Sequence, residues 1–476
     1  MNFNKRLSFY SSVILLAIAL SQETTILAND FNLNTSLSKP IDYSNLNIEG
    51  LLLPRNLFVL SPINSNLDSA NIFYNNAILS NNINTYLTFD SLYGSSNDVS
   101  WSLTNDTYIG AATSDSFDVN VTLNNNGIST LATTNVELVN TSNTEPIRLL
   151  AIGDSLTRAG SYLKHIENVL PNATILGTRF YEGDGMPARE GRGGWTLDKY
   201  FTAINSSELD SPFIFPANIS GKHYKGNTRD WKNICYYDSN NHVYDGFQKI
   251  ARNWRSSGPF VYDLNGYYKY PLKGDVMVDP SYKYGSLWIE WDGTTWSGIP
   301  TPTNYTFDFS KYMDRFNSAF QSGKPTHVSI LLGANDFGYS DALENMQTYI
   351  GRLNEMITSI KAYDKDIKIV ICTPTLGPDT TVVTDTELNF YQNYDQKIKK
   401  ATYYLLQTYD NANCEQEGIY IAPMHLTLDV RNGFDYSTKL QNNETVMSAT
   451  NGIHPNNEYG QIQMGNTLAA VLQKYR

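Results

Sequence analysis

From Ile147 onward the sequence alternates short apolar runs with longer amphipathic stretches, and this pattern constrains the fold more than any other feature. Stretches with apolar residues at helical spacing lie at 157–170, 341–363, 387–410 and 457–475. The apolar runs lie at 147–153, 173–177, 326–333, 367–374 and 418–423. Uninterrupted apolar strands separated by amphipathic helices are typical of a parallel sheet that is covered on both faces. The sequence therefore predicts an α/β fold with a three-layer, flavodoxin-like parallel sheet over residues 146–476.

Residues 29–145 depart from this alternation. Their only cations are Lys39 and Arg55, and Asn, Ser and Thr dominate. Short alternating stretches such as TYLTFD and FDVNVTL predict short antiparallel strands, and hence a small β-sandwich accessory domain. This region holds no cluster of His, Cys or carboxylate residues that would suggest chemistry. A packing or spacer module is the first interpretation, and a carbohydrate-binding module is the alternative.

Residues 205–306 interrupt the α/β pattern with a segment crowded with Tyr and Trp, as in WKNICYYD and YKYGSLWIEWDGTTW. We expect an aromatic-rich β insertion built of hairpins. The rings either form the core of the insertion or present a platform that stacks on sugar rings near the site.

The amino terminus has the layout of a secretory signal peptide, predicted at 1–28. Lys5 and Arg6 precede an apolar stretch at 13–20, with small residues at Ala19 and Ser21. This stretch is shorter than a membrane span, which needs about 20 apolar residues. We expect cleavage after Ser21 or Ala28 and a secreted, extracellular or periplasmic protein without stable membrane insertion. An uncleaved anchor is the alternative.

Charge and cysteine content narrow the class of partner. A formal net charge of −12 at pH 7 argues against a nucleic-acid partner, which would be repelled at long range. Cys235, Cys372 and Cys414 have no metal-ligand spacing and allow at most one disulfide, with Cys235–Cys414 left open. We expect neither a metal nor an organic cofactor.

The stretch AIGDSLT places Ser155 between an apolar strand and a helix. A serine at a helix N-terminus lies beside oriented backbone N–H groups, yet it is a weak nucleophile until a base takes its proton. His454, in the loop NGIHPN before the last helix, is the first candidate base, and His425, after the last strand, is the second. His165 lies in a predicted helix and His327 in a predicted strand, where structural roles are expected.

Acyl transfer also needs donors for the developing oxyanion, each worth about 10²–10³ in rate. The glycine-rich stretch EGRGGWT at 190–196 offers backbone N–H groups that can approach a substrate closely. LLGANDFG puts Asn335 at the end of a buried strand, with its side-chain NH₂ available. Each stretch alone is common in loops, but in this order with Ser155 and His454 they predict a serine hydrolase.

These four motifs resemble the sequence blocks of the GDSL/SGNH hydrolase superfamily, over about residues 147–476. GDSLT matches the block of the nucleophile, Ser155, and GRGGWT resembles the block whose glycine donates its N–H, Gly194. GAND matches the block of the oxyanion asparagine, Asn335, and NGIH matches the block of the base, His454. The resemblance implies an oxyanion hole of the Ser155 and Gly194 amides with the Asn335 side chain. A β-sandwich ahead of such a domain is similar to carbohydrate esterases of the superfamily.

One position departs from the family pattern Asp-x-x-His, because Asn451 stands where the histidine-orienting aspartate is expected. An amide cannot stabilise the imidazolium by charge, and in a serine protease an Asp-to-Asn change in this role lowers turnover about 10⁴-fold. One reading is a Ser-His dyad oriented by Asn451 or by a backbone carbonyl. Other readings are a carboxylate from elsewhere, a weakened or inactive relative, or deamidation of Asn451 to aspartate.

The sequence thus predicts a secreted serine esterase, a carboxylic ester hydrolase that removes O-acetyl groups from an acetylated polysaccharide or glycan through an acyl-enzyme. Export, the accessory module and the Tyr- and Trp-rich insertion favour a sugar substrate. The alternatives are an exported lipase or lysophospholipase of the same fold, or a weakly active or inactive glycan-binding relative.

Overall fold

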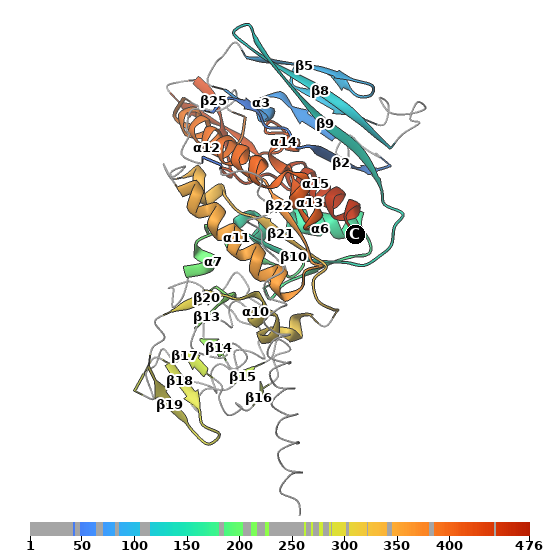
Figure 1. The fold of residues 1–476 in the computed structure, drawn as a ribbon. Helices are drawn as coiled ribbons and strands as arrows, with labels where there is room; N and C mark the ends of the chain where they lie inside the picture. Colours follow the sequence, from blue (N-terminus) through green and yellow to red (C-terminus); the bar gives the residue numbers. More distant parts are fainter. Residues whose placement is uncertain are drawn as a thin grey trace, which may run out of the picture.

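Figure 1 shows the fold of the chain in a computed structural model. It describes residues 41–42, 48–62, 70–80, 85–104, 115–179, 185–202, 211–216, 224–227, 261–262, 268–269, 276–278, 285–286, 288–300, 304–320, 322–339, 345–379, 385–441 and 444–476. The predicted signal peptide at 1–28 and Cys235 lie outside these residues. Within them, no helix combines the length and the apolar character needed to cross a membrane.

A parallel sheet forms the centre of the α/β part. All of its strand pairs are parallel, in the order β11-β10-β21-β22-β23. In chain order this is 2-1-3-4-5, the flavodoxin-like order of doubly wound sheets. A two-residue strand, β12 (Glu190–Gly191), pairs with the end of β10. The five long strands are β10 (Ile147–Gly153), β11 (Ala173–Leu176), β21 (His327–Leu331), β22 (Lys368–Cys372) and β23 (Ile419–Ala422). The predicted parallel sheet is confirmed.

Helices cover both faces of this sheet, and strand alternation divides the core between them (Figure 1). Leu150 and Ile152 belong to the cluster that packs against one set of helices, whereas Leu149 and Ala151 belong to the cluster on the other face. The first set is α10 (Phe309–Arg315), α11 (Met346–Tyr363) and α12 (Asp385–Tyr409); the second is α6 (Ser161–Val169) and α15 (Gly460–Lys474). The three layers predicted from the sequence are therefore present.

The stretch predicted as one helix at 157–170 is two helices, so that prediction is wrong in its continuity. The first, α5 (Ser155–Ala159), begins two residues earlier than expected and ends at Gly160, whose N–H donates to the Leu156 carbonyl at 3.3 Å. The chain then starts again as α6. The N-terminus of α5 lies directly at the end of β10, because only Asp154 separates the two elements.

Two small sheets precede the α/β part. One has the order β2-β9-β8-β5 and the other β3-β7-β6, and their buried side chains form one cluster that includes Ile72, Trp101 and Val119. β8 and β9 pair antiparallel with each other, as do β5 and β8, as predicted. β2 runs parallel to β9, against the prediction, because the long connection between them returns the chain to the same end of the sheet. The strands are β2 (Asn56–Ser61), β3 (Ala70–Phe73), β5 (Tyr86–Ser91), β6 (Ser95–Ser96), β7 (Ser100–Leu103), β8 (Ser116–Asn125) and β9 (Ile128–Asn140).

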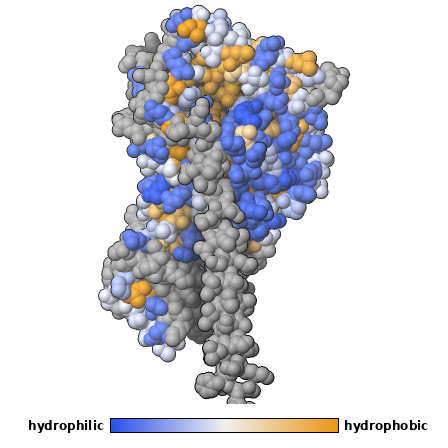
Figure 2. Space-filling model, viewed as in Figure 1, coloured by the Kyte–Doolittle hydropathy of each residue, from blue (hydrophilic) through white to orange (hydrophobic). Residues whose placement is uncertain are grey.

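These sheets share their core with the α/β part. Leu52, next to β1 (Gly50–Leu51), and Leu79, in β4 (Ile78–Leu79), belong to the main cluster of the α/β part. Leu426, in α14 (Met424–Thr427), belongs in turn to the cluster of the small sheets. On the face drawn in Figure 2, hydrophobic residues gather toward the end of the molecule that holds the small sheets. The surface over α6 and the chain end is mostly hydrophilic.

The described part of the insertion at 205–306 consists of short strands. β14 (Tyr224–Asn227), β17 (Val276–Val278), β18 (Trp288–Trp291) and β19 (Trp296–Ile299) form one sheet, β15 (Val261–Tyr262) pairs with β16 (Tyr268–Lys269), and β13 (Ile214–Pro216) pairs with β20 (Tyr305–Phe307). β17, β18 and β19 pair antiparallel as expected of hairpins, whereas β14 pairs parallel with β17. Phe213 stacks on Phe307 at 5.1 Å and both are buried, so these rings are core. Many of the other aromatic residues lie outside the described residues.

Candidate active site

Ser155 is the first residue of α5, at the carboxyl end of β10. Asp154 caps this helix, since its Oδ1 accepts the Leu156 N–H at 3.0 Å. The carboxyl group of Asp154 is buried, and this burial raises its pKa to about 7, with a further contribution from Asp336. The Ser155 N–H belongs to the first turn of a helix, where amides have no intrahelical partner. Ser155 thus presents a hydroxyl and a backbone N–H at the carboxyl end of the sheet.

The structure brings Ser155 and His454 together across 299 residues of sequence. His454 Nε2 lies 2.8 Å from Ser155 Oγ, and His454 Nδ1 lies 3.1 Å from the main-chain carbonyl oxygen of Asn451. A carbonyl oxygen can only accept, so Nδ1 carries the proton and Nε2 of the neutral ring presents its lone pair to the Ser155 hydroxyl. This is the tautomer that a general base for Ser155 requires.

The group that orients His454 is the backbone of Asn451 and not its side chain. Residues 451–454 form a tight turn in which the His454 N–H also donates to the Asn451 carbonyl, at 3.1 Å. Gly452 has a φ of 57° in this turn, a conformation that favours glycine. Within the described part of the chain, the only hydrogen-bond partners of the His454 ring are Ser155 and this carbonyl. Of the alternatives for position 451, the backbone carbonyl is the one observed.

The other histidines of the described residues hold structural positions. His425, the second candidate base, is buried and bonds to Thr373 Oγ1 at 2.8 Å and to the Leu52 carbonyl at 3.1 Å, so it does not contact Ser155. His327 Nε2 lies 2.8 Å from a backbone carbonyl, and His165 Nε2 lies 2.7 Å from a side-chain amide oxygen. His223 and His242 lie outside the described residues.

Gly194 and Asn335 lie on neighbouring loops that are tied together. Asn335 Nδ2 donates to the carbonyl of Trp195 at 3.1 Å, and the Leu197 N–H donates to Asp336 Oδ1 at 2.9 Å. Burial raises the pKa of Asp336 to about 7. Gly194 has a φ of 70°, and a Cβ there would meet no atom within 4 Å, so its conformation rather than crowding favours glycine. The Asn335 turn thus fixes the glycine-rich loop.

A buried ion pair below this loop was missed from the sequence. Glu190 and Arg192 have fully buried side chains and lie 2.8 Å apart. Glu190 Oε1 also accepts the hydroxyls of Thr178, at 2.6 Å, and Tyr312, at 2.8 Å. Tyr200 OH donates to the carbonyls of Gly153, at the end of β10, and Glu190. The Glu-x-Arg spacing was a weak signal, because the other partners are distant in sequence.

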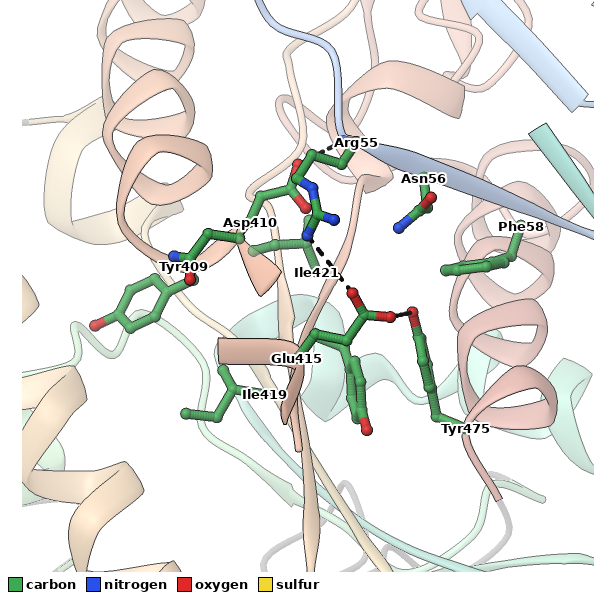
Figure 3. Close-up of a pocket in the computed structure, with 11 residues that line it drawn as sticks. Arg55, Asn56, Phe58, Tyr409, Asp410, Glu415, Ile419, Ile421 and Tyr475 are labelled. Atoms are coloured by element: carbon green, nitrogen blue, oxygen red, sulfur yellow. Dashed lines mark hydrogen bonds and ion pairs between the residues drawn. The ribbon is translucent and has the colours of Figure 1, made fainter. Parts of the chain in front are cut away.

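A small pocket lies at the opposite edge of the sheet, beside the first residue of β23, and not at Ser155 (Figure 3). Its charged groups are engaged with one another: Arg55 and Glu415 lie 3.5 Å apart, and Tyr475 OH donates to Glu415 at 2.7 Å.

Cys414, in α13 (Ala412–Gln416), and Cys372 are buried free thiols. Cys414 is therefore not disulfide-bonded.

No family model matches the sequence, and no curated protein matches it. Solved structures similar to this chain, each at a TM-score of 0.30, include an acetyl esterase mutant with acetate (13% identity, covering 69% of this chain and 100% of that chain). A carbohydrate esterase of family 3 from Talaromyces cellulolyticus is 14% identical, over 69% of this chain and 98% of that chain. A carbohydrate esterase of family 2 with a carbohydrate binding domain, from Corynascus thermopiles, is 12% identical, over 86% and 90%. Likenesses of this size carry no conclusion about activity, so we base the function on the geometry of Ser155, His454 and the loops around them.

Proposed function

We propose that this protein is a serine carboxylic ester hydrolase of the SGNH type that removes O-acetyl groups from a polysaccharide or glycan. The observation that carries the proposal is the Ser155 Oγ to His454 Nε2 distance of 2.8 Å, with the ring held at Nδ1 by a backbone carbonyl. A nucleophile, a base in reach of its proton and an orienting acceptor on the base together match a Ser-His dyad.

The reaction proceeds in two steps. His454 Nε2 takes the proton of Ser155 Oγ as this oxygen attacks the ester carbonyl, and the imidazolium then gives the proton to the leaving alkoxide. An acetyl-enzyme and a free sugar hydroxyl result. Water, deprotonated by His454, then attacks the acetyl-enzyme, and the proton returns to Ser155 Oγ as acetate leaves.

Three donors are assigned to the oxyanion: the backbone amides of Ser155 and Gly194 and the side-chain amide of Asn335. A side-chain NH₂ has two hydrogens. One of those on Asn335 is used by the Trp195 carbonyl, which orients the amide and leaves the second hydrogen for substrate. Preorganised donors of this kind usually provide the largest single contribution to acyl transfer.

A sugar substrate and export complete the proposal. The segment at 1–28 is proposed as a cleaved signal peptide. Mass spectrometry of the amino-terminal peptide of the exported protein tests this. Acetate release from a panel of acetylated polysaccharides tests the substrate class. Higher kcat/KM on nitrophenyl esters of long acyl chains than on the acetate would favour the lipase alternative instead.

The catalytic assignment is tested with 4-nitrophenyl acetate and a serine-directed fluorophosphonate. We expect Ser155→Ala and His454→Ala to lower kcat to the background rate, and Asn335→Ala to lower it about 10²–10³-fold. Ser129→Ala is the matched control, because Ser129 is exposed on β9 and bonds only to a neighbouring strand. The fluorophosphonate should label the peptide that contains Ser155. Label on another serine, or unchanged turnover of Ser155→Ala, would disprove the assignment.

A further inference from the structure

The first half of α12 packs directly on the turn that carries Asn335. This turn, η2 (Ala334–Gly338), meets α12 at Gly338, where an added Cβ would lie 2.1 Å from Cε2 of Tyr394. Tyr394 is buried, and its hydroxyl donates to the Thr375 carbonyl at 3.2 Å. Tyr394 is therefore a fixed ring packed against the turn that carries Asn335.

Two exposed aromatic rings pack against Tyr394. Tyr339, the residue after η2, is 56% exposed, and Phe390, one helical turn before Tyr394, is 42% exposed. Their ring centroids lie 6.1 Å and 6.4 Å from that of Tyr394, and 5.8 Å from each other. These spacings are typical of favourable aromatic pairs, so each ring helps to hold the other in place. We refer to Tyr339 and Phe390 as the aromatic rim.

The aromatic rim lies close to the proposed catalytic groups. Tyr339 is four residues after Asn335 and directly follows the turn that positions it. The Asp154 carboxyl, which caps the helix of Ser155, contributes to raising the pKa of Tyr339 and of Tyr394, after the larger effect of burial. The turn itself lies beside the helix of Ser155, because the Asp154 N–H donates to the carbonyl of Leu331, three residues before η2 begins, at 3.3 Å.

We propose that the aromatic rim is a subsite that binds a sugar ring of the glycan that bears the scissile ester, by stacking against the sugar's apolar face. This inference rests on the proposed function and adds the residues that select the substrate. Exposed rings held by their neighbours lose little conformational freedom on binding, which favours contact with a rigid, flat ligand.

The surroundings of the aromatic rim favour a sugar over an acyl chain. Glu387, one turn before Phe390 on α12, lies 3.0 Å from Lys439 Nζ and accepts the Ser448 hydroxyl at 2.5 Å. Both partners belong to the hairpin of β24 (Tyr436–Gln441) and β25 (Glu444–Ala449). The two ring faces are tilted by 42° to each other. Aromatic faces bordered by charged and hydroxyl groups suit a ligand with one apolar face and hydroxyls at its edge. An acyl chain needs a continuous apolar groove instead.

Binding is tested apart from catalysis, in the full chain carrying Ser155→Ala. Unacetylated cello-, xylo-, manno- and chito-oligosaccharides are titrated by calorimetry. We expect at least one to bind, and Tyr339→Ala and Phe390→Ala each to weaken that binding by about threefold to tenfold. Tyr86→Ala is the matched control, because Tyr86 is an exposed ring on β5 and not in the rim. This variant should bind the sugar as tightly as the chain that carries Ser155→Ala alone. Failure of all four sugars to bind, or equal affinity in the rim variants, would overturn the subsite.

Kinetics in the wild-type background separate stacking from a structural role. We expect the rim variants to raise KM for acetylated xylan while kcat is retained, so that kcat/KM for xylan falls several-fold relative to that for 4-nitrophenyl acetate. An equal fall of kcat on both substrates would mean that the rings only support Asn335, and it would overturn the subsite. A loss that grows with acyl-chain length would assign the rim to the acyl group and also overturn it. Sugar binding that depends on the rim in a protein without esterase activity would refute the proposed function and leave the subsite standing.

Discussion

Replacing Asn451 by alanine is expected to leave the activity nearly unchanged, even though the resemblance to SGNH hydrolases predicts a histidine-orienting aspartate at this position. The acceptor for His454 Nδ1 is the main-chain carbonyl of residue 451, at 3.1 Å, and every amino acid has this atom. Residue 451 is exposed, so the loss of its side chain uncovers no buried group. We expect kcat/KM of Asn451→Ala to lie within about twofold of wild type.

The expected magnitudes separate this account from a role of the side chain. If the Asn451 amide oriented the ring, its removal would resemble the loss of a triad member, which costs about 10⁴-fold when the tautomer is wrong. For Asn451→Asp, the attraction between a carboxylate and an imidazolium in water is about 1 kcal/mol even at about 4 Å, so the gain should not exceed about fivefold. The activities expected for Asn451→Ala under the side-chain account and the backbone account therefore differ by more than three orders of magnitude.

Gly452→Ala is the variant that should impair the same hydrogen bond. The added Cβ meets no atom within 4 Å, so its effect is the strain of a φ of 57°, about 1–2 kcal/mol. Relief of this strain rotates the Asn451 carbonyl away from Nδ1, and we expect kcat to fall about tenfold.

The assay is steady-state hydrolysis of 4-nitrophenyl acetate, with circular dichroism to verify folding of each variant. A loss above about 100-fold in a folded Asn451→Ala would refute the backbone account. A gain above about 100-fold in Asn451→Asp would show instead that the natural residue impairs the enzyme.

Two further predictions concern stability. Because burial raises the pKa of Asp154 to about 7 from about 4 in an unfolded chain, its contribution to stability is complete below pH 4 and is lost as the pH rises through 7. Asp154→Asn should therefore match the melting temperature of wild type at pH 4 and exceed it at pH 8; the same difference at both pH values would contradict this. Glu190→Ala removes the carboxylate that pairs with the buried Arg192 and should lower the free energy of unfolding by about 3–5 kcal/mol in urea titrations. Glu355→Ala, which breaks an exposed pair with Arg352, should lower it by less than about 1 kcal/mol, and equal losses would refute the argument from burial.

The parallel sheet could be predicted because it depends on a local pattern. The Ser155–His454 pair spans 299 residues and was predicted from the order of the motifs and their resemblance to the SGNH blocks. An uninterrupted apolar run is visible in the sequence, and so is a serine that follows it at a strand end. The sequence left several candidates for the group that orients His454. It could not single out the backbone carbonyl, because a main-chain carbonyl has no sequence signature. Its only trace is Gly452, whose backbone freedom permits the turn that aims the carbonyl.

Features that depend on distant pairs were also missed. Glu190 bonds to Tyr312 across 122 residues, and no periodicity links these two positions. The parallel pairing of β2 with β9 depends on tertiary packing rather than on the local pattern. The break of the first helix at Gly160 has a local cause, because this glycine ends α5 in the left-handed conformation. Tyr339 and Phe390 lie side by side only because α12 packs on the Asn335 turn.

His425 shows how a residue with the position of a catalytic base can serve the fold instead. Burial lowers its pKa to about 4, so the ring is neutral and has one donor and one acceptor. Nε2 donates to the Leu52 carbonyl, which leaves Nδ1 to accept the Thr373 hydroxyl. The side-chain amide of Asn76, in α3 (Tyr74–Ala77), donates in turn to the carbonyls of His425 and Leu428. Buried polar groups are costly to leave unpaired, so these bonds favour the packing role for the amino-terminal region, which completes the interior of the α/β part.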